Sequence, residues 1–268
     1  MAGRRCGRCG MGEAVRAVDR IDVPRQFTAE DAARLNARYA DANTTELLHA
    51  VLVEGVAGRI AVVSSFGTES AVLLHLVSQI APDAPVLFLD TGKMFPETLA
   101  YRDELVAHLG LTGLRNIQPD ADTIAKRDET GLRWSYDPDG CCEIRKVIPL
   151  ESALADFDAS LTGRKGFQAT TRADLPRFEF EKGRLKVNPL IDWTKQDLER
   201  WFEANGLPRH PLEAQGYLSI GCAPCTSVVK PGEDPRAGRW RGWNKVECGI
   251  HGESVSNLGD DPANEPVF

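Results

Sequence analysis

The chain has 268 residues and a formal net charge of −7, and 42% of its residues are hydrophobic. This length is enough for one large hydrophobic core, and the acidic balance argues against a general nucleic-acid-binding protein. No stretch approaches the roughly 20 apolar residues of a membrane span, and no apolar run follows the basic N-terminus as in a secretory signal. We therefore expect a cytoplasmic protein with neither nucleic acid nor membrane as a partner.

The first part of the chain is expected to be peripheral up to residue 27. Cys6 and Cys9 lie there in a lone C-x-x-C, which fits either two incidental thiols near a chain end or an accessory redox or metal site. Thr28 and Asp31 then resemble a capping box, with Asp in place of the usual Glu. The apolar spacing that follows predicts amphipathic packing helices up to about residue 56.

Strand patterns and helix patterns alternate from residue 60 onward. Residues 60–65 and 85–90 are short apolar runs typical of buried parallel strands. Helix patterns follow them over residues 69–80 and 96–109. Two further strand candidates are residues 159–162 and 185–190. This order predicts an α/β fold with a mostly parallel sheet flanked by helices.

The last helix signal begins at Thr194, where Asp197 occupies the capping-box position, and it ends near Gly206. From Pro231 the periodicity fades into turn-rich sequence. We therefore divide the chain into a peripheral segment at 1–27, an α/β domain at 28–230 and an irregular C-terminal tail at 231–268.

Five of the seven cysteines form three clusters: Cys141 with Cys142, Cys222 with Cys225, and Cys248 alone. Disulfides rarely persist in the cytoplasm, so clustered cysteines favour metal binding or catalysis. The two pairs supply four thiolates, enough for one iron–sulfur cluster. Two adjacent cysteines on one tetrahedral ion are an awkward geometry, whereas a cubane offers them separate iron atoms. A structural zinc and buried thiols without metal are the alternatives.

The turn after the first strand, Ser64–Ser70, combines hydroxyl groups with a glycine. A strand–loop–helix of this kind presents backbone N–H groups and hydroxyls where an anion can bind at a helix N-terminus. It is neither a Walker A loop nor a G-x-G-x-x-G fingerprint, and a routine helix cap is the alternative. The candidate binding residues are Ser64, Ser65, Gly67, Thr68, Glu69 and Ser70.

Six stretches within about residues 30–252 together carry a resemblance to a known family. They are Ser64–Ser70, Leu89–Gly92, Cys141–Lys146, Asn188–Thr194, Ser219–Thr226 and Glu247–His251. In these stretches the chain resembles the assimilatory bacterial adenylylsulfate (APS) reductases of the iron–sulfur type, in the PAPS/APS reductase family. The resemblance implies the adenine-nucleotide alpha-hydrolase-like fold, with a modified pyrophosphate-binding loop after the first strand.

The resemblance also implies a mechanism. A 4Fe–4S cluster would bind the two cysteine pairs, and Lys146 would add positive charge between cluster and substrate. The thiolate of Cys248 would attack the sulfate sulfur of APS, so that AMP leaves and an S-sulfocysteine remains. Reduced thioredoxin or glutaredoxin would then release sulfite. No thioredoxin-like domain follows Phe268, so an external reductant is expected.

The thiolate and the sulfate are both negative, so cations must offset their repulsion. Besides the loop and Leu89, the expected substrate contacts are Lys146, Arg164, Lys165, Arg236, Arg239 and His251. Any of these basic residues can instead be a solvated surface charge. Relatives often carry two consecutive arginines where this chain has Arg164-Lys165, and a histidine common before the cysteine pair is missing. Which cation meets the phosphate is therefore open.

Other functions compete with APS reduction. A PAPS reductase, or an enzyme that uses both nucleotides, is the nearest alternative, although cluster-free PAPS reductases lack the four ligand cysteines. An iron–sulfur sensor without turnover would not need Cys248. A tRNA-thiolating enzyme of the same superfamily would need a basic RNA surface, which the net charge of −7 disfavours. Assembly with further copies of the chain is left open.

Overall fold

The computed structural model describes residues 25–168, 172–245 and 247–250. Among them, a six-stranded sheet forms the centre, with its strands in the order β3-β2-β1-β4-β6-β5. Neighbouring strands are parallel except β5, which runs antiparallel to β6 at one edge. The strands are β1 (Ile60–Ser64), β2 (Val86–Leu89), β3 (Leu114–Ile117), β4 (Ala159–Thr162), β5 (Phe178–Glu181) and β6 (Arg184–Val187). The expected α/β class with a mostly parallel sheet is confirmed.

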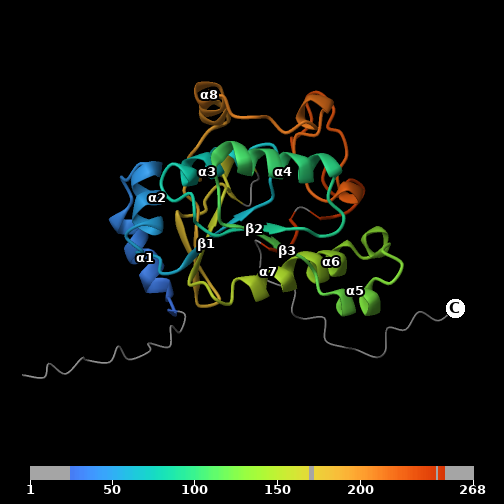
Figure 1. Cartoon of the computed structure of the whole chain (residues 1–268), viewed down its shortest axis with the longest axis horizontal. Coiled ribbons are helices and arrows are strands. Elements are labelled where there is room, and N and C mark those ends of the chain that lie inside the picture. The colour runs from blue at the N-terminus through green and yellow to red at the C-terminus, as the bar shows by residue number, and fades with distance from the viewer. Residues whose placement is uncertain (1–24, 169–171, 246, 251–268) are drawn as a thin grey trace, which may run out of the picture.

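Helices cover both faces of this sheet (Figure 1). They are α1 (Ala29–Arg38), α2 (Thr44–Leu52), α3 (Ser70–Ser78), α4 (Pro96–Leu109), α5 (Ala121–Arg127), α6 (Pro138–Cys142), α7 (Ile148–Ala153) and α8 (Lys195–Asn205). α3 and α4 lie together on one face with α8 outside α3, whereas α7 lies against β2 and β3 on the other face. Within the described part of the chain, no helix is both long and apolar enough to cross a bilayer.

The two capping boxes expected from the sequence are both present. Thr28 Oγ1 accepts a hydrogen bond from the Asp31 N–H, and Thr194 Oγ1 accepts one from the Asp197 N–H, each at 3.2 Å. Such a cap satisfies an N–H group that the helix cannot bond itself and is worth about 1 kcal/mol. α8 then ends at Gly206, whose φ of 58° is the left-handed conformation that glycine adopts readily.

Two apolar clusters hold the layers together. The larger cluster packs one face of the sheet against α1–α4 and α8, and it contains the fully buried side chains of Phe66, Phe88 and Tyr101. The smaller cluster lies on the other face and includes Leu87 of β2 and Leu150 of α7. Each large apolar side chain that is fully buried stabilises the fold by about 1.5–3 kcal/mol.

The strand expected at residues 185–190 is wrong at its C-terminal end. β6 stops at Val187: the Asn188 N–H still bonds the Arg177 carbonyl at 2.8 Å, but Pro189 has no N–H to continue the ladder. β3, β5 and the helical stretch 138–153 were not predicted at all. The helices expected at 69–80 and 96–109 are confirmed as α3 and α4, with α3 slightly shorter.

The strand order fixes where a ligand can bind. β1 and β4 are neighbours in the middle of the sheet, and the chain proceeds from them toward opposite edges. In an open α/β sheet such a reversal creates a crevice at the carboxyl ends of the two strands. Ser64 ends β1 and Thr162 ends β4. The topology therefore brings the Ser64–Ser70 loop next to residues 163–165.

Candidate functional site

A cavity of about 280 Å³ lies at the carboxyl ends of β1 and β4. This volume is close to the lower end of the range for small-molecule sites, about 300–1,000 Å³. All of the expected substrate and nucleophile residues that the structure describes line it: Ser64, Ser65, Gly67, Thr68, Glu69, Ser70, Leu89, Lys146, Arg164, Lys165, Arg236, Arg239 and Cys248. His251 lies outside the described residues.

The loop between β1 and α3 is held in a tight conformation. Phe66 has a φ of 49°, and its fully buried ring packs edge-on against Phe88. The Phe66 N–H donates to Ser64 Oγ at 3.2 Å, and Thr68 Oγ1 donates to the Leu218 carbonyl at 3.1 Å. Glu69, at the N-cap of α3, makes no side-chain capping bond. The first N–H groups of α3 therefore have no capping side chain at the pocket, as an anion site requires.

Arg164 and Lys165 are buried, so the alternative of a solvated surface charge is wrong for both. The Lys165 ammonium pairs with Glu69 Oε2 at 3.0 Å. Arg164 forms an ion pair with Glu179 of β5, and its Nε donates to Asn188 Oδ1 at 3.2 Å. Burial lowers the pKa of Lys165, against the opposing effect of Glu69. Both cations thus have carboxylate partners within the protein.

The basic residues of the tail approach the pocket from the other side. Arg239 Nη1 donates to the Ile220 carbonyl at 3.3 Å, and the guanidinium stacks 4.3 Å from the centroid of the buried Trp240 ring. A Cβ atom at Gly221 would lie 2.3 Å from Arg239 Nη2, so only glycine lets the arginine approach there. Trp243, three residues further along the tail, is 43% exposed, whereas Trp240 is buried.

Lys146 lies between this pocket and a second cavity that contains the cysteine pairs. It is buried and lines both cavities. Burial alone would lower the pKa of Lys146, but the electrostatic effect of the nearby Cys222, Cys248 and Cys142 side chains raises it overall. Lys146 therefore stays charged, and a surface position for it is excluded.

The second cavity is lined by Cys141, Cys142, Cys222 and Cys225 together with Arg145, Lys146 and Trp240. The five cysteines in the described residues are all unpaired thiols. Burial raises the pKa of Cys141 and of Cys142 to about 11. A bound metal centre would lower these two pKa values, because it stabilises the thiolate form.

The adjacent cysteines end a short helix that continues through a π turn. α6, the π turn Glu143–Val147 and α7 follow one another without a break, and the Ile148 N–H donates to the Glu143 carbonyl five residues back. Pro149 has no N–H, and its ring would clash with the carbonyl four residues earlier in a regular α-helix. The wider π turn relieves that clash, and such turns are frequent at functional sites.

The donor set of the second cavity consists of four cysteine thiols. Among the described residues, no three or more His, Cys, Asp or Glu side chains are placed so that they could hold a metal ion. The four cysteines nevertheless line one cavity. An iron–sulfur cubane spreads its four ligands over four iron atoms and so accepts sulfurs that stand further apart.

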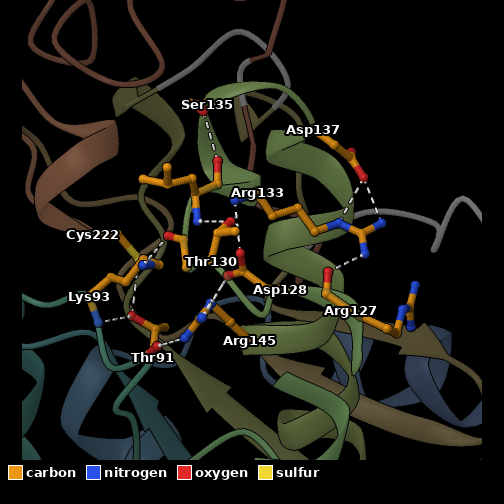
Figure 2. Close-up of polar contacts among 12 residues, drawn as sticks. Thr91, Lys93, Arg127, Asp128, Thr130, Arg133, Ser135, Asp137, Arg145 and Cys222 are labelled. Atoms are coloured by element: carbon orange, nitrogen blue, oxygen red, sulfur yellow. Dashed lines mark hydrogen bonds and ion pairs between the residues drawn. The ribbon is translucent and has the colours of Figure 1, made fainter. Parts of the chain in front are cut away.

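A buried polar network supports the cysteine cavity from outside (Figure 2). Thr91 Oγ1 lies 3.2 Å from Cys222 Sγ, and the Thr91 carbonyl accepts from Arg145 Nη1 at 2.8 Å. Arg145 also binds Asp128 Oδ2, at 2.6 and 3.1 Å. The side chain of Asp128 is 0% exposed, and burial acts to raise its pKa, but bonds from the Arg133 N–H and from Arg145 lower it overall. Asp128 is thus an ionised carboxylate that holds Arg145 in place.

We expect Asp128→Asn to lower the free energy of unfolding by about 3–5 kcal/mol, because it leaves the buried Arg145 charge without its partner. Glu151→Gln is the matched control. It breaks an exposed pair with Lys182 and should change stability by no more than about 0.5 kcal/mol. Anaerobic denaturant unfolding of both variants measures the difference. Equal midpoints for the two variants would show that the Asp128–Arg145 pair is dispensable.

Comparison with known proteins agrees with this geometry. A family model described as the phosphoadenosine phosphosulfate reductase domain matches residues 59–228. The chain belongs to this reductase family. A family member from Mesorhizobium japonicum, named adenosine 5′-phosphosulfate reductase, is 49% identical over 236 residues, which cover 88% of this chain and 93% of the relative. One of the same name from Mycolicibacterium smegmatis is 41% identical, with 83% and 94% covered.

A solved structure supports the fold of the family. The phosphoadenylyl-sulfate (PAPS) reductase of Candida auris, in complex with phosphate, is 26% identical and superposes with a TM-score of 0.65. The match covers 77% of this chain and all of that one, 100%. The resemblance to the PAPS/APS reductases and the expected adenine-nucleotide alpha-hydrolase-like fold are confirmed.

Sequence reasoning gave no role to several residues of the pocket. Gln168, Arg172 and Glu247 line it. Arg172 and Gln168 lie beyond the Arg164-Lys165 pair, outside every motif that carried the resemblance. Glu247 was noted only as the first residue of the Cys248 motif. Its charge gave no signal, because an isolated glutamate is usually a solvated surface residue.

Proposed function

We propose that this reductase converts APS to sulfite and AMP in sulfate assimilation. The observation that carries the proposal is that Cys248 lines the same cavity as the anion-binding loop and the cations Lys146, Arg236 and Arg239. Relatives named adenosine 5′-phosphosulfate reductase that match more than 80% of the chain support this substrate.

The proposed chemistry has two displacements at sulfur. The Cys248 thiolate attacks the sulfate sulfur of APS, and the bond from that sulfur to the bridging oxygen breaks. AMP leaves with the electron pair, and Cys248 carries a sulfonate group. A thiolate of reduced thioredoxin or glutaredoxin then attacks Cys248 Sγ, and sulfite leaves with the electron pair of the S–S bond. The second thiol of the reductant resolves the mixed disulfide, so two electrons come from one dithiol.

The chain's own residues bind and orient the anionic groups. The backbone of the Ser64–Ser70 loop and the N-terminus of α3 receive the phosphate. Lys146, Arg236 and Arg239 face the sulfate, where fixed positive charge offsets the approach of the thiolate. Leu89, at the end of β2, gives apolar contact to the nucleoside. The proposed contact from His251 stays a prediction from the sequence.

We assign a 4Fe–4S cluster to Cys141, Cys142, Cys222 and Cys225, on the strength of the shared cavity and the soft thiolate donor set. When bound, the cluster supplies a fixed charge centre beside Lys146 and joins two distant parts of the chain. Lys146 carries the electrostatic influence of that centre to the pocket, because it lines both cavities. We place the reaction in the cytoplasm, where thioredoxin is reduced.

The function is tested with anaerobically purified, cluster-loaded protein. Sulfite release from APS should require reduced thioredoxin or glutaredoxin, and AMP should form in equal amount. Without reductant, one sulfonate per chain should be found on Cys248 by mass spectrometry. No sulfite and no adduct from cluster-loaded protein would overturn the proposal.

Nucleotide selectivity is the next expected result. Use of PAPS would need further cations for its 3′-phosphate, but Arg164, Lys165 and Arg209 of the pocket already pair with carboxylates. We expect kcat/KM for APS to exceed that for PAPS by at least ~10-fold, about 1.4 kcal/mol of transition-state discrimination. Steady-state assays with both nucleotides measure the ratio. Equal or reversed values would favour the alternative, a PAPS reductase or one with dual use.

A further inference from the structure

The described end of the tail, Glu247–Ile250, contacts the body of the protein on both sides of Cys248. Gly249 has a φ of 85°, and a Cβ atom there would lie 3.3 Å from Val147 Cγ2 of the π turn. The glycine thus lets the backbone turn close to the helix that carries the cysteine pair. The residues on either side of Cys248-Gly249 are Glu247, which makes ionic contacts, and Ile250, which makes apolar contacts.

Glu247 is the ionic contact. Its Oε1 accepts from Arg172 Nε at 3.0 Å and Nη2 at 2.7 Å, and its Oε2 lies 3.2 Å from Arg236 Nη2. Both carboxylate oxygens are therefore held by arginines that line the pocket. Arg172 is buried and is oriented by a further bond from its Nη1 to Gln168 Oε1 at 2.7 Å. Charge-assisted bonds to a buried arginine are stronger than those of an exposed ion pair.

Ile250 is the apolar contact. Its side chain packs against the smaller core cluster, which contains Leu150 and Leu154 of α7. With Gly249 it also lines a small cavity beside Val63 of β1. Ile250 thereby removes apolar surface from water on the face of the sheet opposite α3 and α4. This burial fixes the direction in which the chain leaves Cys248.

We propose that Glu247 and Ile250 are positioning residues that form a two-point clasp and hold Cys248 over the pocket. This rests on the proposed role of Cys248 as the nucleophile. The ionic point of the clasp uses Arg172 and Arg236, which are cations that an anionic group in the pocket can also bind. A sulfonate formed on Cys248 repels the adjacent Glu247 carboxylate and competes for the same arginines. Sulfur transfer thus weakens the clasp, so that the modified cysteine becomes accessible to the reductant.

The clasp is tested by the rate at which iodoacetamide, an uncharged reagent, modifies Cys248 in the full-length, cluster-loaded protein. Peptide mass mapping follows Cys248 separately from the other cysteines. Rates are compared on the alkaline plateau, where the thiol is fully ionised, so that a lost carboxylate cannot act through the thiolate fraction. We expect Glu247→Gln and Ile250→Ala each to raise the plateau rate at least ~5-fold. Glu233→Gln, which breaks an ion pair with Arg241 in the same tail, is the control and should change it less than ~2-fold.

A second measurement separates positioning from a general structural defect. In single turnovers, Glu247→Gln should slow adduct formation from APS at least ~5-fold, but leave reduction of the preformed adduct by thioredoxin as fast as in the wild type or faster. If Glu247→Gln and Ile250→Ala are alkylated at the wild-type rate, the clasp is overturned. If Glu247→Gln slows both adduct formation and adduct reduction, Glu247 has a structural role and not a positioning role. The alkylation assay does not depend on turnover. If the two variants show faster alkylation but the wild type produces no sulfite from APS, the proposed function is refuted and the clasp is not.

Discussion

Replacing Cys248 with serine should abolish sulfite formation from APS, with a loss of at least about 10³-fold, because a neutral hydroxyl cannot replace the thiolate as nucleophile. Nucleotide binding and the brown colour of the protein should persist, since Cys248 is not among the cysteines that line the second cavity. Sulfite release and equilibrium binding of AMP measure the two properties in the same preparation.

The double variant Cys6→Ser, Cys9→Ser is the control for this experiment. It removes the two remaining thiols of the chain and should keep full turnover, because the proposed adduct forms on Cys248 alone. Sustained turnover by Cys248→Ser, or a sulfonate trapped on another cysteine of the wild type, would show that the nucleophile is a different group.

Replacing any one of Cys141, Cys142, Cys222 or Cys225 with serine should lose or destabilise the cluster. The two pairs are about 80 residues apart in sequence yet line one cavity, so the cluster would tie distant segments together. Metal binding couples to folding, and we expect a loss of at least roughly 2 kcal/mol, or about 4–8 °C in Tm for a chain of this size. Iron and sulfide analysis and thermal unfolding under anaerobic conditions measure both effects.

The cysteine that lies outside the quartet gives the matched comparison. Cys248→Ser should retain four irons per chain and the Tm of the wild type. Four irons in each of the four ligand variants would contradict the assignment. Zinc in place of iron in anaerobically purified wild type would contradict it directly.

The elements that sequence reasoning found are those whose residues face the core on a regular period. β1 and β2 are almost wholly apolar, and α4 is bounded by Pro96 in its first turn and Gly110 at its C-cap, so these signals are visible without the fold. β3 was missed because Arg115 and Asn116 leave half of this edge strand exposed. The helical stretch 138–153 was missed because Pro138, Gly140 and Pro149 interrupt any helical period.

The site was predictable where a motif carries it and unpredictable where partners meet only in the folded chain. The loop after β1 and each cysteine pair are short continuous segments, so the sequence alone indicates their chemistry. The carboxylate partners of the cations are not. Glu69 meets Lys165 across 96 residues, and Glu247 meets Arg172 across 75. Such pairings depend on strand order and on the path of the tail, which no local pattern encodes.

The π turn between the cysteine pair and α7 sets the direction in which Cys141 and Cys142 face. A π turn is equivalent to a one-residue insertion in an α-helix, and each residue of an α-helix advances about 100° around its axis. Removing that single residue would rotate Cys141 and Cys142 by about this angle relative to α7 and the sheet. The cysteine pair would then no longer face the Cys222 segment, although every ligand would still be present. The cavity thus depends on a residue count as well as on residue identity.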